Sequence, residues 1–156
     1  MIYDRTEADV TAALAIREQK IKQFLPLTAE ELATLERGFI DYNTLNRIED
    51  KQSELRDLLV ASGYSFFDVE TKHWNETDIF NELELDRIVN NLDEFKKAVS
   101  VLKTTPQTPL PRFHYTNIND IERILYDLNF AVTNMLANVN FGWAIGIADV
   151  GLYFTI

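Results

Sequence analysis

The sequence predicts a mainly α-helical protein, a bundle of about four to five helices with a small β hairpin near the C-terminal end. Apolar residues recur at helical spacing (i, i+3, i+4, i+7) in several segments. Capping pairs precede two of these segments, and glycines or prolines separate them. The final sixteen residues instead combine glycines with β-forming residues, which predicts the hairpin.

Two short helices are expected in the N-terminal quarter of the chain. Residues 6–24 begin with Thr6 and Asp9, and residues 28–38 begin with Thr28 and Glu31. A hydroxyl followed three residues later by a carboxylate is the capping-box pattern, which satisfies free N–H groups at a helix start. Glycine ends the second helix, and leucines 14, 32 and 35 are expected to face inward.

Three longer helices are expected over residues 44–61, 82–102 and 117–139. Residues 64–74 are rich in β-forming residues and predict a short strand or an extended arm. The last helix is the most apolar of the three, so burial on more than one side is expected. The residues predicted to fill the core are Ile48, Leu55, Ile88, Leu92, Ile121 and Leu128.

A proline-rich stretch marks the clearest internal boundary. Three prolines fall within six residues of the segment 104–116. Proline fixes φ and lacks an N–H donor, so this segment is expected to be an extended linker. It would separate a helical domain, residues 1–103, from a long apolar helix with a β-rich tail, residues 117–156.

The tail itself is unusually apolar. Residues 141–156 carry one charged side chain, Asp149, and three glycines among aromatic and branched residues. A hairpin turning near Ala148 and Asp149 is expected, and it must be covered by this chain's own core or by a neighbouring subunit. The residues predicted to form a subunit interface are Phe141, Trp143, Ile145, Leu152, Tyr153 and Phe154.

Composition excludes several classes of function. The chain has 156 residues, no cysteine and a net charge of −10. Disulfide frameworks, thiol catalysis and cysteine metal sites are therefore excluded. Excess negative charge makes nucleic acid and acidic membrane surfaces poor partners. Neither a signal peptide nor an apolar run long enough to span a membrane is recognised.

One short phrase occurs three times in similar form, each time where a helix is expected to start. The first copy is LNRIE, the second is LDRI, and the third is INDIE. Their residues are Leu45, Asn46, Arg47, Ile48 and Glu49; Leu85, Asp86, Arg87 and Ile88; and Ile118, Asn119, Asp120, Ile121 and Glu122.

The phrase has a local physical logic. Its first and fourth residues share one face of a helix, while a short polar side chain falls in the first turn, where free N–H groups favour an acceptor. The glutamates benefit from the same positive field. Ordinary helix starts that match by chance in a helix-rich chain are the alternative explanation.

The first copy also resembles a known group of proteins. The stretch YNTLNRIEDKQSEL resembles the DLNRIE helix near the start of many bacteriophage tail-fibre and baseplate-associated proteins. The order of YDRTEADV, LNRIE, Gly63-Tyr64, Thr71-x-x-Trp74, TTPQTPLP and NDIERIL is similar to small proteins of phages and prophages of Gram-positive bacteria. This resemblance covers roughly residues 3–136. It implies a virion part without enzymatic activity, and the apolar tail departs from it.

Few residues suggest chemistry. His73 lies near several acidic residues, but the spacing matches no metal-ligand motif. His114 precedes a helix and is expected to pack or cap. Glu49 and Glu122 could form an acid–base pair, although both are expected on exposed helix starts. Without a glycine-rich phosphate loop or a nucleophile elbow, no cofactor, metal or catalytic residue is expected.

Four aromatic residues could stack on sugars or on a partner. They are Phe66, Phe67, Trp74 and Trp143. Core packing is the simpler expectation, with Trp143 the best candidate for a contact between subunits.

The sequence and the resemblance together predict a structural subunit of a phage particle, at the tail tip, the baseplate or a fibre attachment point. Its partners would be other virion proteins, in a homotrimer or homohexamer made in the host cytoplasm. The alternative is a small acidic binding or regulatory module of the cytoplasm that sequesters a basic partner. Salt-sensitive partner binding would favour the module.

Overall fold

The computed structural model describes residues 1–65 and 69–151, with side chains placed up to residue 137 of the last helix. Helices account for all regular structure in these residues, which confirms the predicted helical bundle. They are α1 (Glu7–Gln19), a 3₁₀ turn η1 (Ile21–Gln23), α2 (Ala29–Gly38), α3 (Tyr42–Ala61), α4 (Glu82–Ala98) and α5 (Tyr115–Gly151).

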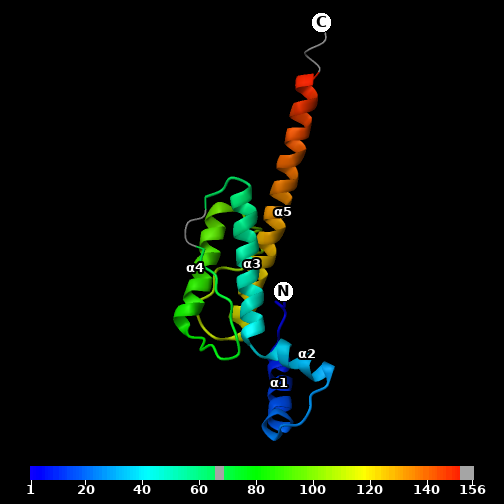
Figure 1. The fold of residues 1–156 in the computed structure, drawn as a ribbon, viewed down its shortest axis with the longest axis vertical. Helices are drawn as coiled ribbons and strands as arrows, with labels where there is room; N and C mark the ends of the chain where they lie inside the picture. The colour runs from blue at the N-terminus through cyan, green and yellow to red at the C-terminus, as the bar shows by residue number, and fades with distance from the viewer. Residues whose placement is uncertain (66–68, 152–156) are drawn as a thin grey trace.

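Three helices, α3, α4 and α5, run parallel to one another (Figure 1). Parallel neighbours need long connections, because the chain must return to the starting end after each helix. The described residues of the two returns, 62–65 with 69–81 and 99–114, lie alongside the bundle. All three helices therefore begin at the same end, where the α1–α2 hairpin also attaches.

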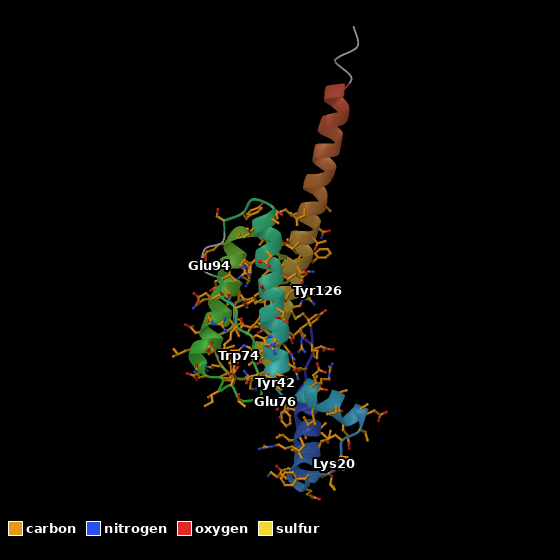
Figure 2. The ribbon with its side chains drawn as sticks, in the orientation of Figure 1. Lys20, Tyr42, Trp74, Glu76, Glu94 and Tyr126 are labelled. Atoms are coloured by element: carbon orange, nitrogen blue, oxygen red, sulfur yellow. The ribbon has the colours of Figure 1, made fainter. Side chains whose placement is uncertain are left out.

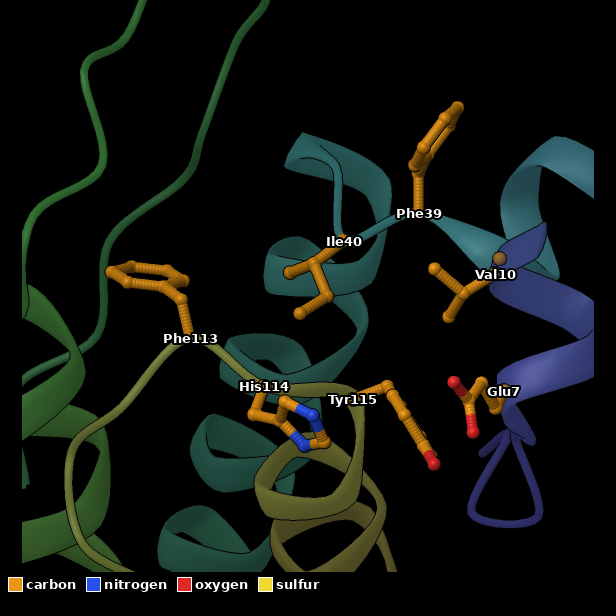
Figure 3. A pocket seen from close by; sticks show the side chains of 8 residues that line it. Glu7, Val10, Phe39, Ile40, Phe113, His114 and Tyr115 are labelled. Atoms are coloured by element: carbon orange, nitrogen blue, oxygen red, sulfur yellow. The ribbon is translucent and has the colours of Figure 1, made fainter. Parts of the chain in front are cut away.

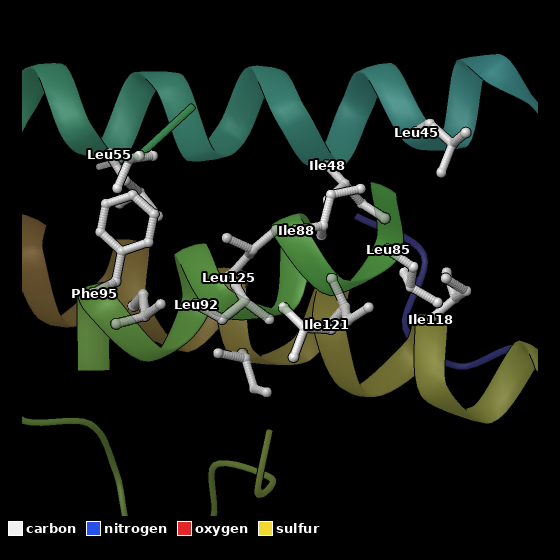
Figure 4. Packing of buried hydrophobic residues seen from close by; sticks show 14 of the residues in the cluster. Leu45, Ile48, Leu55, Leu85, Ile88, Leu92, Phe95, Ile118, Ile121 and Leu125 are labelled. Atoms are coloured by element: carbon white, nitrogen blue, oxygen red, sulfur yellow. The ribbon is translucent and has the colours of Figure 1, made fainter. Parts of the chain in front are cut away.

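The core lies between these three helices (Figure 4). The predicted core residues are confirmed, since Ile48, Leu55, Ile88, Leu92, Ile121 and Leu128 are all fully buried. Burying one such side chain contributes about 1.5–3 kcal/mol, so this apolar layer supplies most of the stabilisation of the bundle.

The α1–α2 hairpin packs through small residues. Both predicted capping boxes are present, at Thr6 and at Thr28. Gly38 approaches α1 so closely that a Cβ there would lie 2.4 Å from the Ala13 Cβ. This close approach leaves no interior for larger side chains. The expectation that Leu14 and Leu32 face inward is therefore wrong, because they are 41% and 54% exposed.

The predicted C-terminal hairpin is also wrong. Residues up to Gly151 continue α5 as helix, including the expected turn at Ala148 and Asp149. Once a helix is nucleated in a packed core, each added residue costs little, and a glycine costs only ~1 kcal/mol relative to alanine. Within the described residues, no helix has an apolar stretch long enough to cross a bilayer.

The proline-rich segment contacts the bundle. Thr105 is buried and its hydroxyl donates to the carboxylate of Asp127 on α5 at 2.7 Å. Lys96 on α4 donates to the Pro106 carbonyl oxygen at 2.8 Å. The helix that follows this segment shares one apolar core with α3 and α4.

The other return segment has no strand in its described part. Residues 64–65 and 69–74 are without regular structure, so the expectation of an extended arm fits better than that of a strand. Trp74 in this segment is buried and its ring meets Phe80 edge to face, with centroids 5.1 Å apart. Core packing is therefore the role of Trp74.

Candidate functional site

The three copies of the repeated phrase lie in one layer at the starting end of the bundle. Because α3, α4 and α5 are parallel, the first residues of the copies, Leu45, Leu85 and Ile118, come together. The fourth residues, Ile48, Ile88 and Ile121, form the next layer (Figure 4). All six are buried, between 0% and 4% exposed. The phrase therefore marks a common register of three helices.

The asparagines of two copies each hold the backbone of a distant segment. Asn46 accepts from the Trp74 backbone N–H at 2.7 Å and donates to the Trp74 carbonyl at 2.9 Å. Asn119 makes the same pair of bonds with Arg5, at 3.3 and 2.9 Å. An amide side chain thus replaces a missing backbone partner in both places.

Glu49 is the centre of the first polar cluster. Its carboxylate accepts from the Trp74 indole N–H and from the Lys72 backbone N–H, each at 3.1 Å. It also forms a two-pronged ion pair with Arg87 of α4. Hydrogen bonding to Glu49 raises the pKa of the Arg87 guanidinium. Neighbouring amides extend this cluster, since Asn91 donates to the Gln52 side chain at 2.8 Å.

Glu122 is the centre of the second cluster. Its carboxylate pairs with Arg5 from the N-terminal segment and accepts from Nε of Arg47 on α3 at 2.8 Å. The Arg5 and Glu122 side chains are fully buried. Two cations therefore share one buried carboxylate, and this arrangement joins the N-terminal segment, α3 and α5.

These contacts follow a cyclic rule. Taking the helices in the cyclic order α3, α4, α5 and back to α3, the arginine of each copy reaches the glutamate of the helix before it. Arg87 of α4 therefore pairs with Glu49 of α3. Arg47 of α3 pairs in the same way with Glu122 of α5, the other neighbour of α3. At the third junction, between α5 and α4, the position of the arginine holds Asp120 and the position of the glutamate holds Val89.

Two departures in the phrase, Val89 and Asp120, are therefore the two missing halves of one pair. The second copy lacks its glutamate, and the third copy lacks its arginine. Burial raises the pKa of the Asp120 carboxyl. The three helices and the segments beside them form a pseudo-threefold arrangement in which two of three ionic contacts are kept.

This geometry corrects one expectation about the glutamates. They do not lie on exposed helix starts, since Glu49 is 1% exposed and Glu122 is fully buried. Both oxygens of each carboxylate already accept from positively charged or N–H groups. Their position in the fold is that of buried connectors between segments.

The remaining candidates are scattered. His114 shares a hydrogen bond of 2.7 Å with the Thr116 hydroxyl at the start of α5, as expected for a capping residue. Among the residues that the structure describes, no group of three His, Asp or Glu side chains could hold a metal ion. Phe66, Phe67, Leu152, Tyr153 and Phe154 lie outside the described residues, as do the side chains of Phe141, Trp143 and Ile145.

Sequence reasoning missed Arg5 and the two pockets at the starting end of the bundle. Arg5 is separated from its partners on α5, Asn119 and Glu122, by more than 110 positions, so no local pattern could reveal these contacts. One pocket, of about 560 Å³, lies between the α1–α2 hairpin and the start of α5 (Figure 3). The other, of about 290 Å³, lies beside the start of α3.

Comparisons with known proteins add no relative: no protein-family model, curated protein or solved structure matches this chain.

Proposed function

We propose that this protein is a non-enzymatic structural subunit of a bacteriophage particle, at the tail tip, the baseplate or a fibre attachment point. The proposal joins the resemblance of the LNRIE helix to phage tail proteins with the shape of the molecule. The observation that carries it is the exposed apolar tip of the α1–α2 hairpin, together with the apolar sequence of the far part of α5.

The hairpin end is apolar at its tip. Phe24 is 96% exposed, and Leu25, Leu32 and Ile21 are each at least 41% exposed. Phe24 also adopts a left-handed backbone conformation with φ of 55°, which is uncommon for a bulky residue. Strained residues of this kind persist only where the surrounding structure holds them, and they cluster at functional sites. A neighbouring subunit would cover this tip.

Among the residues that the structure describes, α5 alone forms the opposite end. With 37 residues, α5 is roughly 55 Å long, whereas the 20 residues of α3 span roughly 30 Å. The far part of α5 extends beyond the bundle (Figure 1). Its sequence carries a single charge after residue 137, and an isolated helix of this kind is marginal in water. It therefore suits contact with other copies in a trimer or hexamer.

The test is the solution mass by light scattering, for the full chain and for a chain that ends at Val139. A full-length trimer or hexamer that becomes a folded monomer on truncation supports a subunit that assembles through α5. If both chains are monomers with the same circular dichroism spectrum at micromolar concentration, assembly through α5 is refuted. In that case the small acidic binding module becomes the better account.

A further inference from the structure

We propose that the starting end of the bundle is a docking surface for an arginine-bearing peptide segment of a partner protein. This inference does not rest on the proposed function. It rests on the two pockets, whose linings are similar. Each is lined by aromatic and aliphatic residues and by at least one carboxylate, and neither is lined by a lysine or an arginine. We call the combined surface the acidic-aromatic face.

The two pockets are neighbours. Ile40 lines both of them. Phe80 of the smaller pocket meets Phe113 of the larger one edge to face, with ring centroids 4.2 Å apart. An extended peptide could therefore occupy both pockets without crossing a polar ridge between them.

The larger pocket fits a long cationic side chain. Val10 and Ile40 offer aliphatic surface, and Tyr115 and Glu7 point toward one another across the pocket (Figure 3). Arginine matches this lining in three ways: its methylene stem packs on aliphatic walls, its planar head stacks on an aromatic ring, and its donors match a carboxylate. Glu7 forms no ion pair among the described residues, so its carboxylate is free to take one.

The smaller pocket repeats these features. Its carboxylates are Asp41, Glu76 and Asp78, and its rings include Tyr42 and Phe80. Glu76 is close to Tyr42 and Trp74 at the base of α3 (Figure 2), and accepts from the Tyr42 hydroxyl at 3.4 Å. A second cationic side chain of the same peptide would meet this carboxylate.

The net charge of this face determines whether it attracts a positively or a negatively charged ligand. The starts of α1, α3 and α5 lie at this face, and α4 begins just after Phe80 of the smaller pocket. Each helix start contributes a positive field of roughly half a charge, so together they offset about two of the four negative charges of Glu7, Asp41, Glu76 and Asp78. The face thus retains a negative potential, which attracts a basic segment and repels an acidic one.

The test is titration of the full chain with a capped nine-residue peptide of glycine, serine and three arginines, followed by amide NMR shifts. The matched control peptide carries citrulline, which has the shape of arginine without its charge. The expected result is shift changes confined to residues of the acidic-aromatic face and binding about tenfold weaker for the citrulline peptide. Equal binding of the two peptides, or no binding of the arginine peptide at millimolar concentration, would overturn the proposal.

A variant pair separates a specific site from general attraction to an acidic protein. The double variant Glu7→Gln/Glu76→Gln removes one carboxylate from each pocket. The control Glu54→Gln/Glu94→Gln removes the same charge twelve residues after the starts of α3 and α4. Binding about tenfold weaker only in the first variant supports the site. An equal loss in both variants refutes it, with folding of each checked by circular dichroism.

Discussion

At the scale of residues, the two buried carboxylates are not equivalent. Arg87 is 21% exposed and also pairs with Glu84, so it can keep a partner and some water when Glu49 is neutralised. Arg5 is fully buried, and its Nε and Nη2 atoms have no hydrogen-bond partner. Arg5 therefore depends on Glu122, because an uncompensated buried charge is costly.

The substitution Glu122→Gln is expected to destabilise the protein by about 3–5 kcal/mol, and Glu49→Gln by about half as much. Urea unfolding followed by circular dichroism measures both values. The exposed Glu94→Gln, which removes a surface pair with Lys97, should change stability by less than about 1 kcal/mol. A loss for Glu122→Gln no greater than that for Glu94→Gln would contradict the assigned role of this carboxylate.

The cyclic rule predicts that the missing third pair can be built. Val89→Glu alone places a carboxylate at a position that is 6% exposed, and should cost about 3 kcal/mol. Adding Asp120→Arg supplies the arginine that the rule places opposite it.

A double-mutant cycle on these two positions should give a favourable coupling of about 1 kcal/mol or more. The combination of Val89→Glu with Asp120→Asn is the matched control, because it removes the like charge without adding an arginine. If asparagine rescues stability as well as arginine does, the pseudo-threefold rule fails at this junction.

At the scale of elements, the α1–α2 hairpin is held by close backbone contact, by Arg37 and by an ion pair between Lys20 and Glu31. Arg37 on α2 donates to Asp9 on α1 and to the Asp4 carbonyl, at 2.8 and 2.9 Å. The capping hydrogen bonds from Thr6, together with the bond from Arg37, lower the pKa of the Asp9 carboxyl. The apolar contribution is small, because Ala13 is the one buried hydrophobic residue among the helical residues of the hairpin.

Gly38→Ala should therefore loosen the hairpin. The added methyl group would lie 2.4 Å from both the Ala13 Cβ and the Asp9 carbonyl oxygen, which is backbone and cannot move aside. A loss of about 1–3 kcal/mol is expected, with faster amide exchange in α1 and α2 than in α3.

The control for this prediction is Gly63→Ala. Gly63 has φ of 89° and open space around it, so its substitution should cost only the backbone strain, about 1 kcal/mol, and leave exchange in the hairpin unchanged. Equal exchange in α1 for both variants would show that the close approach does not hold the hairpin.

Short-range sequence patterns predicted where helices begin better than they predicted which side chains of those helices are buried. Thr6 and Thr28 identified two helix starts, because a capping box is a short-range pattern. Leu14 and Leu32 were misplaced because helical spacing cannot tell a thick interface from one made by Ala13 and Gly38. The tail was misread because residue propensities ignore that a helix already nucleated in a core continues at little cost.

For the site, the sequence revealed the repeat but not its partners. The phrase identified Asn46, Glu49, Asn119 and Glu122 as a set. Their bonds to Arg5 and to the Trp74 backbone join segments far apart in the chain, so no periodicity could reveal them. One signal was present in the sequence: the second copy lacks the glutamate and the third lacks the arginine, which is the pattern of a single lost contact.

At the scale of the whole molecule, the repeated phrase joins three parallel helices into one unit. The N-terminal segment is held by Asn119 and Glu122, the segment before α4 by Asn46 and Glu49, and the proline-rich segment by Lys96 and Asp127. The proline-rich return is thus bonded to both helices that it connects, α4 and α5, and Glu122 joins α5 to Arg47 of α3. Such cross-connection predicts that α5 unfolds together with α3 and α4 despite the prolines that precede it.

Native-state hydrogen exchange tests this central claim most directly. The amides of Ile48, Ile88 and Ile121 occupy the same layer on three different helices, and each is fully buried. The account predicts that all three exchange only through global unfolding, with the same free energy to within about 0.5 kcal/mol and the same dependence on denaturant. Exchange of Ile121 at a distinctly lower free energy than Ile48 and Ile88 would contradict it, because α5 would then open as a separate unit beyond the proline-rich segment.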